Sequence, residues 1–359
     1  MSINVKSILD KIKMDHENFT IDDKIVKFDE CVHLNEYQIE LIISVIKKFI
    51  SDIDINFAEG VFSDIFKKPS IKENGKIYET LLYGWLIEHE ISFKPQVEIK
   101  AEDCLKKNKY DADGQISNVI FDVKSFGFGF THIDTFRNKL QNKLKNYIVT
   151  IEGSKNISAK DLDKYALCNI DKIANELQND KNKIYTCYKY CIKELDLEIR
   201  AIPKEEMMAI SISQFNPYEW AKNNQFFFIK SASQFCVSSP YIIFCPFDSD
   251  INHMMNNEND IQVMLRALCR RIFINLEHMN NRKVFEFDGK AKQEATIAIA
   301  SRKISAIIFL DVVKYHSYED CRTWVYVNPN ADNPLFNYQI DQWFRQAGAF
   351  IDDFKYDNY

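Results

Sequence analysis

The stretch YDADGQISNVIFDVK, residues 110–124, decides the fold. Residues 110–116 alternate between polar and apolar positions and residues 119–124 are mostly apolar, as β-strands are, and the Ser-Asn pair between them favours a tight turn. With the turn there, counting back along the two strands places Asp113 directly opposite Asp122. We therefore expect a β-hairpin in which two carboxylates face each other.

Two facing aspartates predict a cation site, because like charges directly across a ladder destabilise it. Asp111 and Lys124 fall on one face by the two-residue period of a strand. Oxygen ligands with no nearby His or Cys favour Mg²⁺, with Mn²⁺ as a substitute. A lysine beside such an ion can orient the attacking water and offset charge in a phosphoryl transition state. The pattern predicts a phosphodiesterase.

On these residues the segment resembles the PD-(D/E)xK nuclease superfamily, whose restriction-endonuclease-like core is a helix, three strands, a helix and a further strand. Periodicity predicts those elements in the same order. They are a helix at 76–90, strands at 93–99, 110–116 and 119–125, a helix at 133–147 and a strand at 147–151. The resemblance covers residues 76–147.

The resemblance implies roles for individual residues. Asp113 and Asp122 are then metal ligands, Glu79 on the preceding helix is a direct or water-mediated ligand, and Lys124 is the catalytic lysine. The residues leave open whether Asp111 or Asp113 is the ligand on the second strand. Gln141 and Tyr147 are six positions apart instead of one helical turn, which departs from the RecB-like exonucleases. An endonuclease is therefore expected.

The rest of the chain predicts an α/β (α+β) protein with a restriction-endonuclease-like mixed central sheet flanked by helices. We expect a helical N-terminal region at 1–60, with a helix at 37–50, and one nuclease domain with a C-terminal elaboration at 61–359. Helices are predicted at 158–177 and 260–279. Further strands are predicted at 184–190, 195–202, 207–213, 225–230, 241–244, 304–311 and 323–328.

Two groups of basic residues are candidates for contact with phosphate groups. The first lies on the predicted helix after the hairpin: Arg137, Lys139, Lys143 and Lys145. The second lies on the helix at 260–279: Arg266, Arg270 and Arg271. The alternative for each is a solvated helix face. Aromatic residues at 218–228 offer stacking surfaces for bases, or else a buried strand.

Composition narrows the classes of function. The chain has 46 basic and 52 acidic residues, a net charge of −6, which argues against coating nucleic acid by bulk charge but not against a local basic groove. Nine cysteines without a CxxC pair indicate reduced thiols and no zinc site. No apolar run reaches membrane-spanning length and no signal peptide is evident, so a soluble cytoplasmic protein without membrane contact is expected.

These observations predict a Mg²⁺-dependent nuclease acting on DNA, of restriction or anti-phage type. The alternatives are a ribonuclease and a module of the same fold that binds nucleic acid or protein without cutting. The family resemblance also implies a homodimer or a partner protein of a defence system.

Overall fold

The computed structural model describes residues 3–22, 31–32, 34, 36–67, 75–105, 109–124, 131–153, 159–184, 187–204, 216–247, 258–279, 296–311 and 322–355. The chain divides into two compact units. Unit 1 comprises Met1–Phe126 and Asn216–Tyr359, and unit 2 comprises Gly127–Phe215. This division differs from the expected one: the N-terminal helices belong to unit 1, and unit 2 is inserted within the segment expected to be one nuclease domain.

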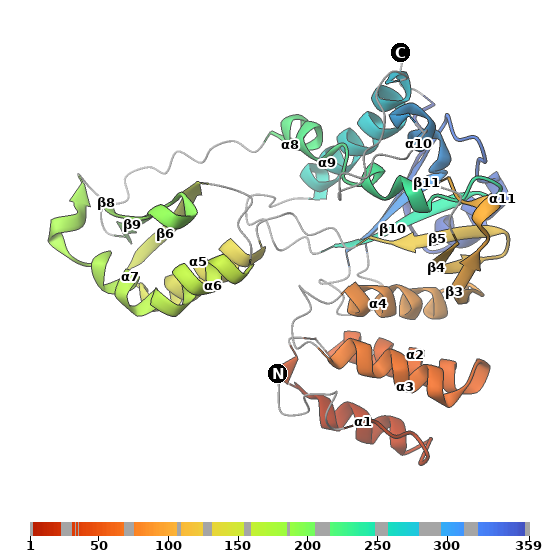
Figure 1. Cartoon of the computed structure of the whole chain (residues 1–359), viewed down its shortest axis with the longest axis horizontal. Coiled ribbons are helices and arrows are strands. Elements are labelled where there is room, and N and C mark those ends of the chain that lie inside the picture. Colours follow the sequence, from red (N-terminus) through yellow and green to blue (C-terminus); the bar gives the residue numbers. More distant parts are fainter. Residues whose placement is uncertain are drawn as a thin grey trace. The chain divides into compact units, whose positions relative to one another are not determined.

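A seven-stranded mixed sheet forms the centre of unit 1 (Figure 1). Its strands in spatial order are β13 (Phe350–Asp352), β12 (Thr323–Val327), β11 (Ala306–Asp311), β10 (Tyr241–Phe247), β5 (Val119–Val123), β4 (Tyr110–Ile116) and β3 (Lys94–Ile99). Antiparallel pairs join β3, β4 and β5, and β10 runs parallel to both β5 and β11. The mixed α/β class expected from the sequence is confirmed.

The hairpin of β4 and β5 has the predicted register. Gly114 pairs with Phe121, as counting back from the turn requires. Ser117 begins the turn in the left-handed region of the backbone, with φ 54°. A Cβ atom at Gly114 would lie 2.4 Å from the Phe121 ring and 2.8 Å from the carbonyl oxygen of Lys94, so only glycine fits there. The register is therefore fixed by packing as well as by the turn.

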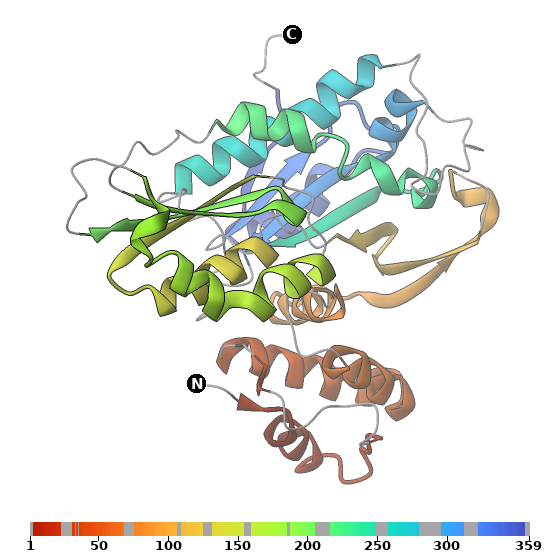
Figure 2. The ribbon, with the colours of Figure 1, turned by 60° about the vertical axis from the view of Figure 1, so that its left-hand side comes forward.

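Helices from the N-terminal part stack on one side of this sheet, and the last of them, Gly75–Glu88, lies nearest to the strands (Figure 2). They are α1 (Val5–Lys13), α2 (Glu36–Asp52), α3 (Ile55–Phe66) and α4 (Gly75–Glu88), with a two-stranded pair of β1 (Ile3–Asn4) and β2 (Cys31–Val32) beside them. Phe121 and Phe244 lie in the same apolar core as these helices. The helices predicted at 37–50 and 76–90 are confirmed.

The opposite face carries α8 (Pro217–Asn224), α9 (Glu258–Arg270) and α10 (Ile297–Lys303). The Tyr326 hydroxyl of β12 donates to the carbonyl oxygen of Gln262 on α9, at 3.2 Å. After α9 the chain continues as a π-helical turn, Arg271–Asn275, and a 3-10 turn, Leu276–His278, so the predicted helix at 260–279 is confirmed. None of the helices within the described ranges is long and apolar enough to cross a membrane.

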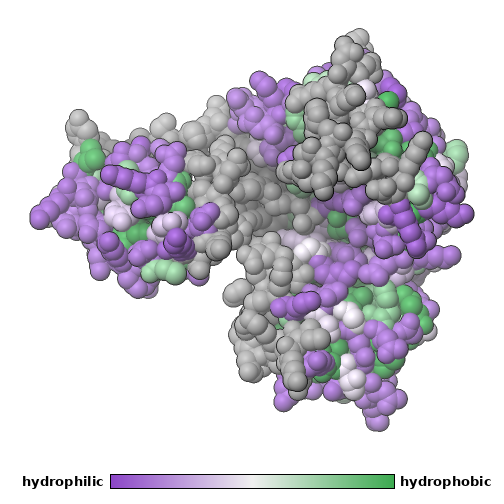
Figure 3. Space-filling model, viewed as in Figure 1, coloured by the Kyte–Doolittle hydropathy of each residue, from purple (hydrophilic) through white to green (hydrophobic). Residues whose placement is uncertain are grey.

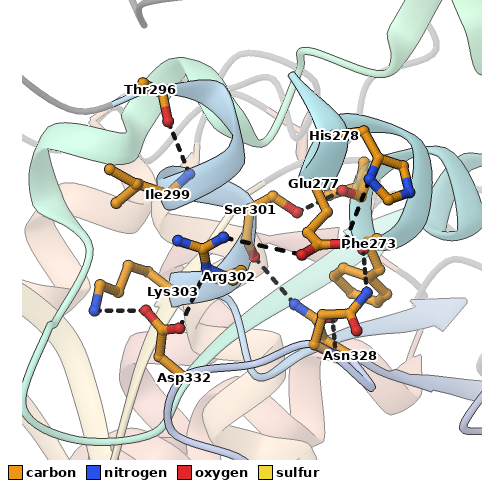
Figure 4. A network of polar contacts seen from close by, with 12 residues as sticks. Phe273, Glu277, His278, Thr296, Ile299, Ser301, Arg302, Lys303, Asn328 and Asp332 are labelled. Atoms are coloured by element: carbon orange, nitrogen blue, oxygen red, sulfur yellow. Dashed lines mark hydrogen bonds and ion pairs between the residues drawn. The ribbon is translucent and has the colours of Figure 1, made fainter. Parts of the chain in front are cut away.

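A polar network fastens α10 to the segment that follows β12 (Figure 4). The Asn328 amide donates to the carbonyl oxygens of Ser301 and Ile304, at 3.0 and 2.7 Å. Arg302 lies 3.3 Å from Asp332, and Lys303 lies 2.8 Å from the same carboxylate. α11 (Asn337–Ile340) and a second π-helical turn, Asp341–Arg345, then lead to β13.

Unit 2 has its own sheet and its own core. The strands, in the order β6 (Tyr147–Gly153), β9 (Leu197–Pro203), β8 (Cys187–Ile192) and β7 (Lys183–Ile184), are all antiparallel. They pack with α5 (Thr131–Lys143), α6 (Ala159–Tyr165) and α7 (Ile170–Glu176). The strand predicted at 147–151 therefore exists but lies in a different sheet from the hairpin. Local periodicity predicts a strand without naming its neighbour.

One predicted element is wrong, one is confirmed in part, and one lies outside the described residues. Residues 225–230 form turns leading into a 3-10 segment, Ile229–Gln234, instead of a strand. Their run of phenylalanines matched strand propensity, but the chain continues from α8 in helical geometry. The helix predicted at 158–177 is interrupted by a 3-10 turn at Leu167–Asn169. The strand predicted at 207–213 falls outside the described residues.

Candidate active site

The two predicted carboxylates meet where β4 and β5 part. The backbone N–H of Asp113 lies 3.4 Å from Asp122 Oδ1, and Asp113 Oδ2 accepts a hydrogen bond from the Val123 N–H at 2.6 Å. Asp122 is completely buried, whereas Asp113 is partly exposed. The predicted juxtaposition of these two aspartates is confirmed. Asp111, the alternative, is exposed, and its backbone position pairs with Glu98 on the outer strand.

Two tyrosines hold the buried carboxylate. Tyr110 donates its hydroxyl to Asp122 Oδ1, and Tyr241 donates to Oδ2 at 2.6 Å. Burial, and next the charge of Asp122, raise the pKa of both tyrosines, so both hydroxyls stay protonated donors. Because a buried carboxylate without such donors is costly, these two bonds explain how Asp122 is accommodated in the core.

Lys124 lies at the edge of this arrangement. Its backbone N–H donates to the carbonyl oxygen of Phe244 on β10, which continues the strand pairing beyond β5. Its Nζ atom lies 3.4 Å from Asp122 Oδ2 and 3.4 Å from Oε1 of Gln234. The side chain is 26% exposed, so the ammonium group lies between a buried carboxylate and solvent.

Glu79 on α4 reaches the hairpin through Tyr83. Glu79 Oε1 accepts from Lys76 Nζ at 2.6 Å and from the Tyr83 hydroxyl at 2.7 Å. The same hydroxyl lies 2.6 Å from the carbonyl oxygen of Asp113. Burial, and then the charge of Glu79, raise the pKa of Tyr83, which therefore remains a donor between helix and hairpin. The structure thus brings Glu79 near the two aspartates but engages its carboxylate with other partners.

The site carries more negative charge than its cations offset. Burial, then the charges of Asp122 and Glu79, raise the pKa of Asp113 to about 7, against the lowering effects of the Val123 N–H and Lys124. Burial also raises the pKa of the neighbouring Cys104 thiol to about 11, with Asp122 among the lesser causes. A cation near Asp113 would relieve this repulsion.

The carboxylate side chains at this site fit a cation held by two of them better than one held by three. Within the described ranges, no three His, Cys, Asp or Glu side chains gather closely enough to hold a metal ion. Glu79 is engaged by Lys76 and Tyr83, and both oxygens of Asp122 accept from tyrosines. Mg²⁺ is commonly bound by one or two carboxylates completed by water and phosphate oxygens. Asp113, which is partly exposed, is the carboxylate best placed to bind such an ion, and Asp122 would share it only if a tyrosine released one of its oxygens.

The predicted basic helix exists as α5, but it ends at Lys143, so Lys145 lies beyond it. Both belong to unit 2, whereas the carboxylates belong to unit 1. Lys139, Lys143 and Lys145 are exposed, and Arg137 is half-buried. Lys143 forms an ion pair of 2.6 Å with Asp171 on α7. The exposed lysines fit a phosphate-contacting face and a solvated face equally well, so the role of these four residues stays a prediction.

Sequence reasoning missed four residues that shape the site: Tyr83, Tyr110, Gln234 and Tyr241. Tyr83 follows Glu79 by one helical turn, a spacing that could have indicated the contact. Tyr241 begins a strand whose other residues are apolar, and a buried tyrosine usually needs a partner for its hydroxyl. That partner lies 119 positions away, at Asp122, which no local pattern reveals.

Comparisons with family models, with curated proteins and with solved structures find no match to this chain.

Proposed function

We propose that the protein is a metal-dependent nuclease that hydrolyses phosphodiester bonds, acting as a DNA endonuclease. The observation that carries the proposal is the pair of facing aspartates, Asp113 and Asp122, with Lys124 Nζ 3.4 Å from the second carboxylate. Two carboxylates and a lysine at the end of adjacent strands supply what metal-assisted phosphodiester hydrolysis needs: a cation site and a positive group beside it.

The order of the strands also supports the proposal. α4 precedes three antiparallel strands, and β10 then runs parallel to β5. The core of the PD-(D/E)xK superfamily that the hairpin sequence resembles has a helix, three strands, a helix and a further strand. α4, β3, β4 and β5 supply the first four elements and β10 could serve as the further strand, whereas the expected second helix, α5, belongs to unit 2. In this chain, unit 2 would be an insertion between the third and fourth strands of that core. The restriction or anti-phage setting rests on the resemblance alone.

In this mechanism each side chain has a defined task. Asp113, together with Asp122, would hold the cation, and Mg²⁺ bound there would supply stabilisation for the negative charge that develops on the phosphate. Lys124, partly open to solvent, orients the attacking water and offsets the charge that develops on the phosphate. Gln234 positions the ammonium group of Lys124. Glu79 and Tyr83 hold the backbone of Asp113 in place.

The reduced cysteines support a cytoplasmic location. The seven cysteines whose side chains the structure describes are free thiols. A chain rich in unpaired thiols is typical of a reducing compartment.

A second candidate is a module of the same fold that binds nucleic acid without cutting it. The observation that favours it is the double capping of Asp122 by Tyr110 and Tyr241, which leaves the carboxylate buried and satisfied. Tyr110→Phe separates the two candidates, because it removes the donor to Oδ1. A nuclease then binds Mn²⁺ at least as tightly and still cuts, whereas a non-cutting module only loses stability.

The direct test is incubation of the full chain with plasmid, linear duplex DNA, single-stranded DNA and RNA, in Mg²⁺, Mn²⁺ or EDTA. We expect metal-dependent cleavage of circular DNA, and a loss of about 100-fold or more in Lys124→Ala. Lys189→Ala is the matched control, because Lys189 also pairs with a carboxylate across a sheet, but in unit 2. Cleavage of RNA alone would assign a ribonuclease, and full activity in Lys124→Ala would contradict the proposed mechanism.

A further inference from the structure

The two tyrosines that hold Asp122 bind different oxygens of its carboxylate. Tyr241 donates to Oδ2 at 2.6 Å, and the ammonium group of Lys124 lies 3.4 Å from the same atom. Tyr110 donates to Oδ1, which is also the oxygen that faces Asp113, whose backbone N–H lies 3.4 Å from it. A cation shared by the two aspartates therefore meets Tyr110 at Oδ1, whereas a positive charge already lies beside Oδ2.

Tyr241 is held in place from several sides. Its side chain is completely buried on β10, between β5 and β11. Its backbone N–H donates to the Ser305 hydroxyl at 2.8 Å, and that hydroxyl donates to the carbonyl oxygen of Asn333 at 2.6 Å. Its ring packs against that of Phe235, with the ring centroids 5.0 Å apart. Because protein interiors are close-packed, Tyr241 cannot leave Asp122 without opening the core.

Tyr110 has a more open position than Tyr241. It is the first residue of β4 and pairs with Ile99 at the end of β3, the edge strand of the sheet. Its side chain is partly exposed, and the preceding Lys109 is exposed together with its ion-pair partner Glu98. Figure 3 shows mainly hydrophilic residues at this edge of unit 1, where β3 and β4 lie. Side chains near solvent change rotamer readily, so the Tyr110 ring can turn outward without opening the core.

A cation and the Tyr110 hydroxyl compete for the same place on Oδ1. A carboxylate oxygen has two lone pairs, and here the hydroxyl of Tyr110 and the N–H of Asp113 face them. In the cation-free chain the hydroxyl stabilises a buried charge, because a carboxylate without donors in the interior is costly. A bound cation compensates that charge by itself, so the hydrogen bond from Tyr110 is no longer needed.

We infer that Tyr110 is a displaceable cap on Oδ1 of Asp122 and thereby regulates cation binding. Its hydroxyl occupies this oxygen in the cation-free chain and turns away when a cation binds Asp113 and Asp122. The inference rests on the proposed function, because it takes the cation site as given. Tyr110 is a positioning residue, since it acts on the site through Asp122. The cap lowers the apparent affinity in proportion to the fraction of chains in which Oδ1 is free.

The first test is calorimetric titration of Mn²⁺ into the native chain, Tyr110→Phe and Tyr241→Phe at pH 7. We expect Tyr110→Phe to bind at least about five-fold more tightly than the native chain, because phenylalanine keeps the ring and removes the competing donor. Tyr241→Phe is the matched control: it also removes one donor to Asp122 but leaves Oδ1 capped, so its affinity does not rise. If Tyr110 had a merely structural role, its replacement would leave the affinity unchanged or lower it.

The second test follows Tyr110 in the native chain, without a substitution that disturbs folding. A near-ultraviolet difference spectrum records a tyrosine hydroxyl that loses its hydrogen bond to a carboxylate. We expect a tyrosine difference band when saturating Mg²⁺ is added to the native chain and to Tyr241→Phe, and no band in Tyr110→Phe. Tyr338→Phe, which changes an exposed tyrosine on α11, is a further control and should keep the band.

The outcomes separate the cap from the cation site itself. Binding of Mn²⁺ by the native chain, with equal or weaker binding by Tyr110→Phe, would overturn the cap and leave the cation site standing. Binding of Mg²⁺ by the native chain without a tyrosine difference band would also overturn the cap. Absence of binding in all three chains would overturn the cation site, and with it both the proposed function and the cap.

Discussion

Charged side chains face one another across strands in both sheets, with opposite electrostatic results. In the four-stranded sheet, Glu198 lies 2.5 Å from Lys189 and 2.7 Å from Arg200, and hydrogen bonds from these two residues lower its pKa. Across β4 and β5, Asp113 instead faces Asp122, and burial and the neighbouring carboxylates raise its pKa to about 7. The first arrangement pairs opposite charges near solvent, and the second gathers like charges in the interior.

The difference indicates that the Asp113–Asp122 site, unlike the Glu198 site, has a role other than stabilising the fold. Solvent-exposed pairs of opposite charge form readily and contribute little. A buried group of like charges opposes folding, and such groups are concentrated at functional sites. The residues of the β4–β5 site therefore lower the stability of the fold, whereas those around Glu198 do not.

The largest expected effect follows from removing one of the facing charges. In Asp113→Asn the buried charge and its repulsion by Asp122 and Glu79 are lost, so unit 1 becomes more stable in EDTA, by an amount on the order of 4 kcal/mol at pH 8 and about 1–2 kcal/mol at pH 5. The sign follows from the raised pKa: the folded chain binds more protons than the unfolded one between about pH 4 and pH 7, so native stability falls as pH rises through that window.

Urea unfolding followed by tryptophan fluorescence measures this effect in the right unit. All four tryptophans of the chain lie in unit 1: Trp85, Trp220, Trp324 and Trp343. The control is Glu198→Gln in unit 2, which removes a complementary charge and should leave this unfolding transition of unit 1 unchanged. An Asp113→Asn gain that does not grow with pH would show that the buried charge of Asp113 is not the cause.

The second effect tests whether packing holds the hairpin register. Gly114→Ala places a methyl group 2.4 Å from the Phe121 ring, inside the contact distance, and next to backbone at Lys94. We expect unit 1 to lose about 1–3 kcal/mol of stability by the same fluorescence measurement. Gly60→Ala is the matched control, because a Cβ atom there meets nothing within 4 Å. Equal stability of the two variants would show that the hairpin opens easily.

The smallest effect compares the turns of the two sheets. Ser117 and Asp196 each occupy the left-handed backbone region, with φ 54° and 50°. Aspartate tolerates this region better than serine, so Ser117→Gly should stabilise its hairpin by about 0.5 kcal/mol and Asp196→Gly by less. Hydrogen exchange of the two hairpins, read by mass spectrometry, measures both. A larger gain at Asp196 would contradict this ranking.

The hairpin could be predicted from sequence because its determinants are local. The alternation of residues 110–116, the Ser-Asn turn and the apolar run after it fix both strands and their register, and with them the meeting of Asp113 and Asp122. Mixed α/β class followed in the same way from periodicity along the chain.

The rest depends on contacts between distant segments. No local pattern shows that β10 lies beside β5 or that β6 belongs to another sheet, because the sequence of a strand does not identify the strands it pairs with. The hydrogen bond from Tyr241 to Asp122 depends on the same long-range assembly. The strand predicted at 225–230 is wrong because aromatic residues favour strands in general, whereas here they lie in helical turns.

The most direct test of the central claim, that Asp113 and Asp122 form a cation site, is calorimetric titration of Mn²⁺ into the native chain and into Asp113→Asn and Glu198→Gln at pH 7. The account predicts saturable binding by the native chain and by Glu198→Gln, accompanied by proton release because Asp113 is partly protonated at this pH, and loss of that binding in Asp113→Asn. Absence of binding in the native chain, or unchanged binding in Asp113→Asn, would contradict it.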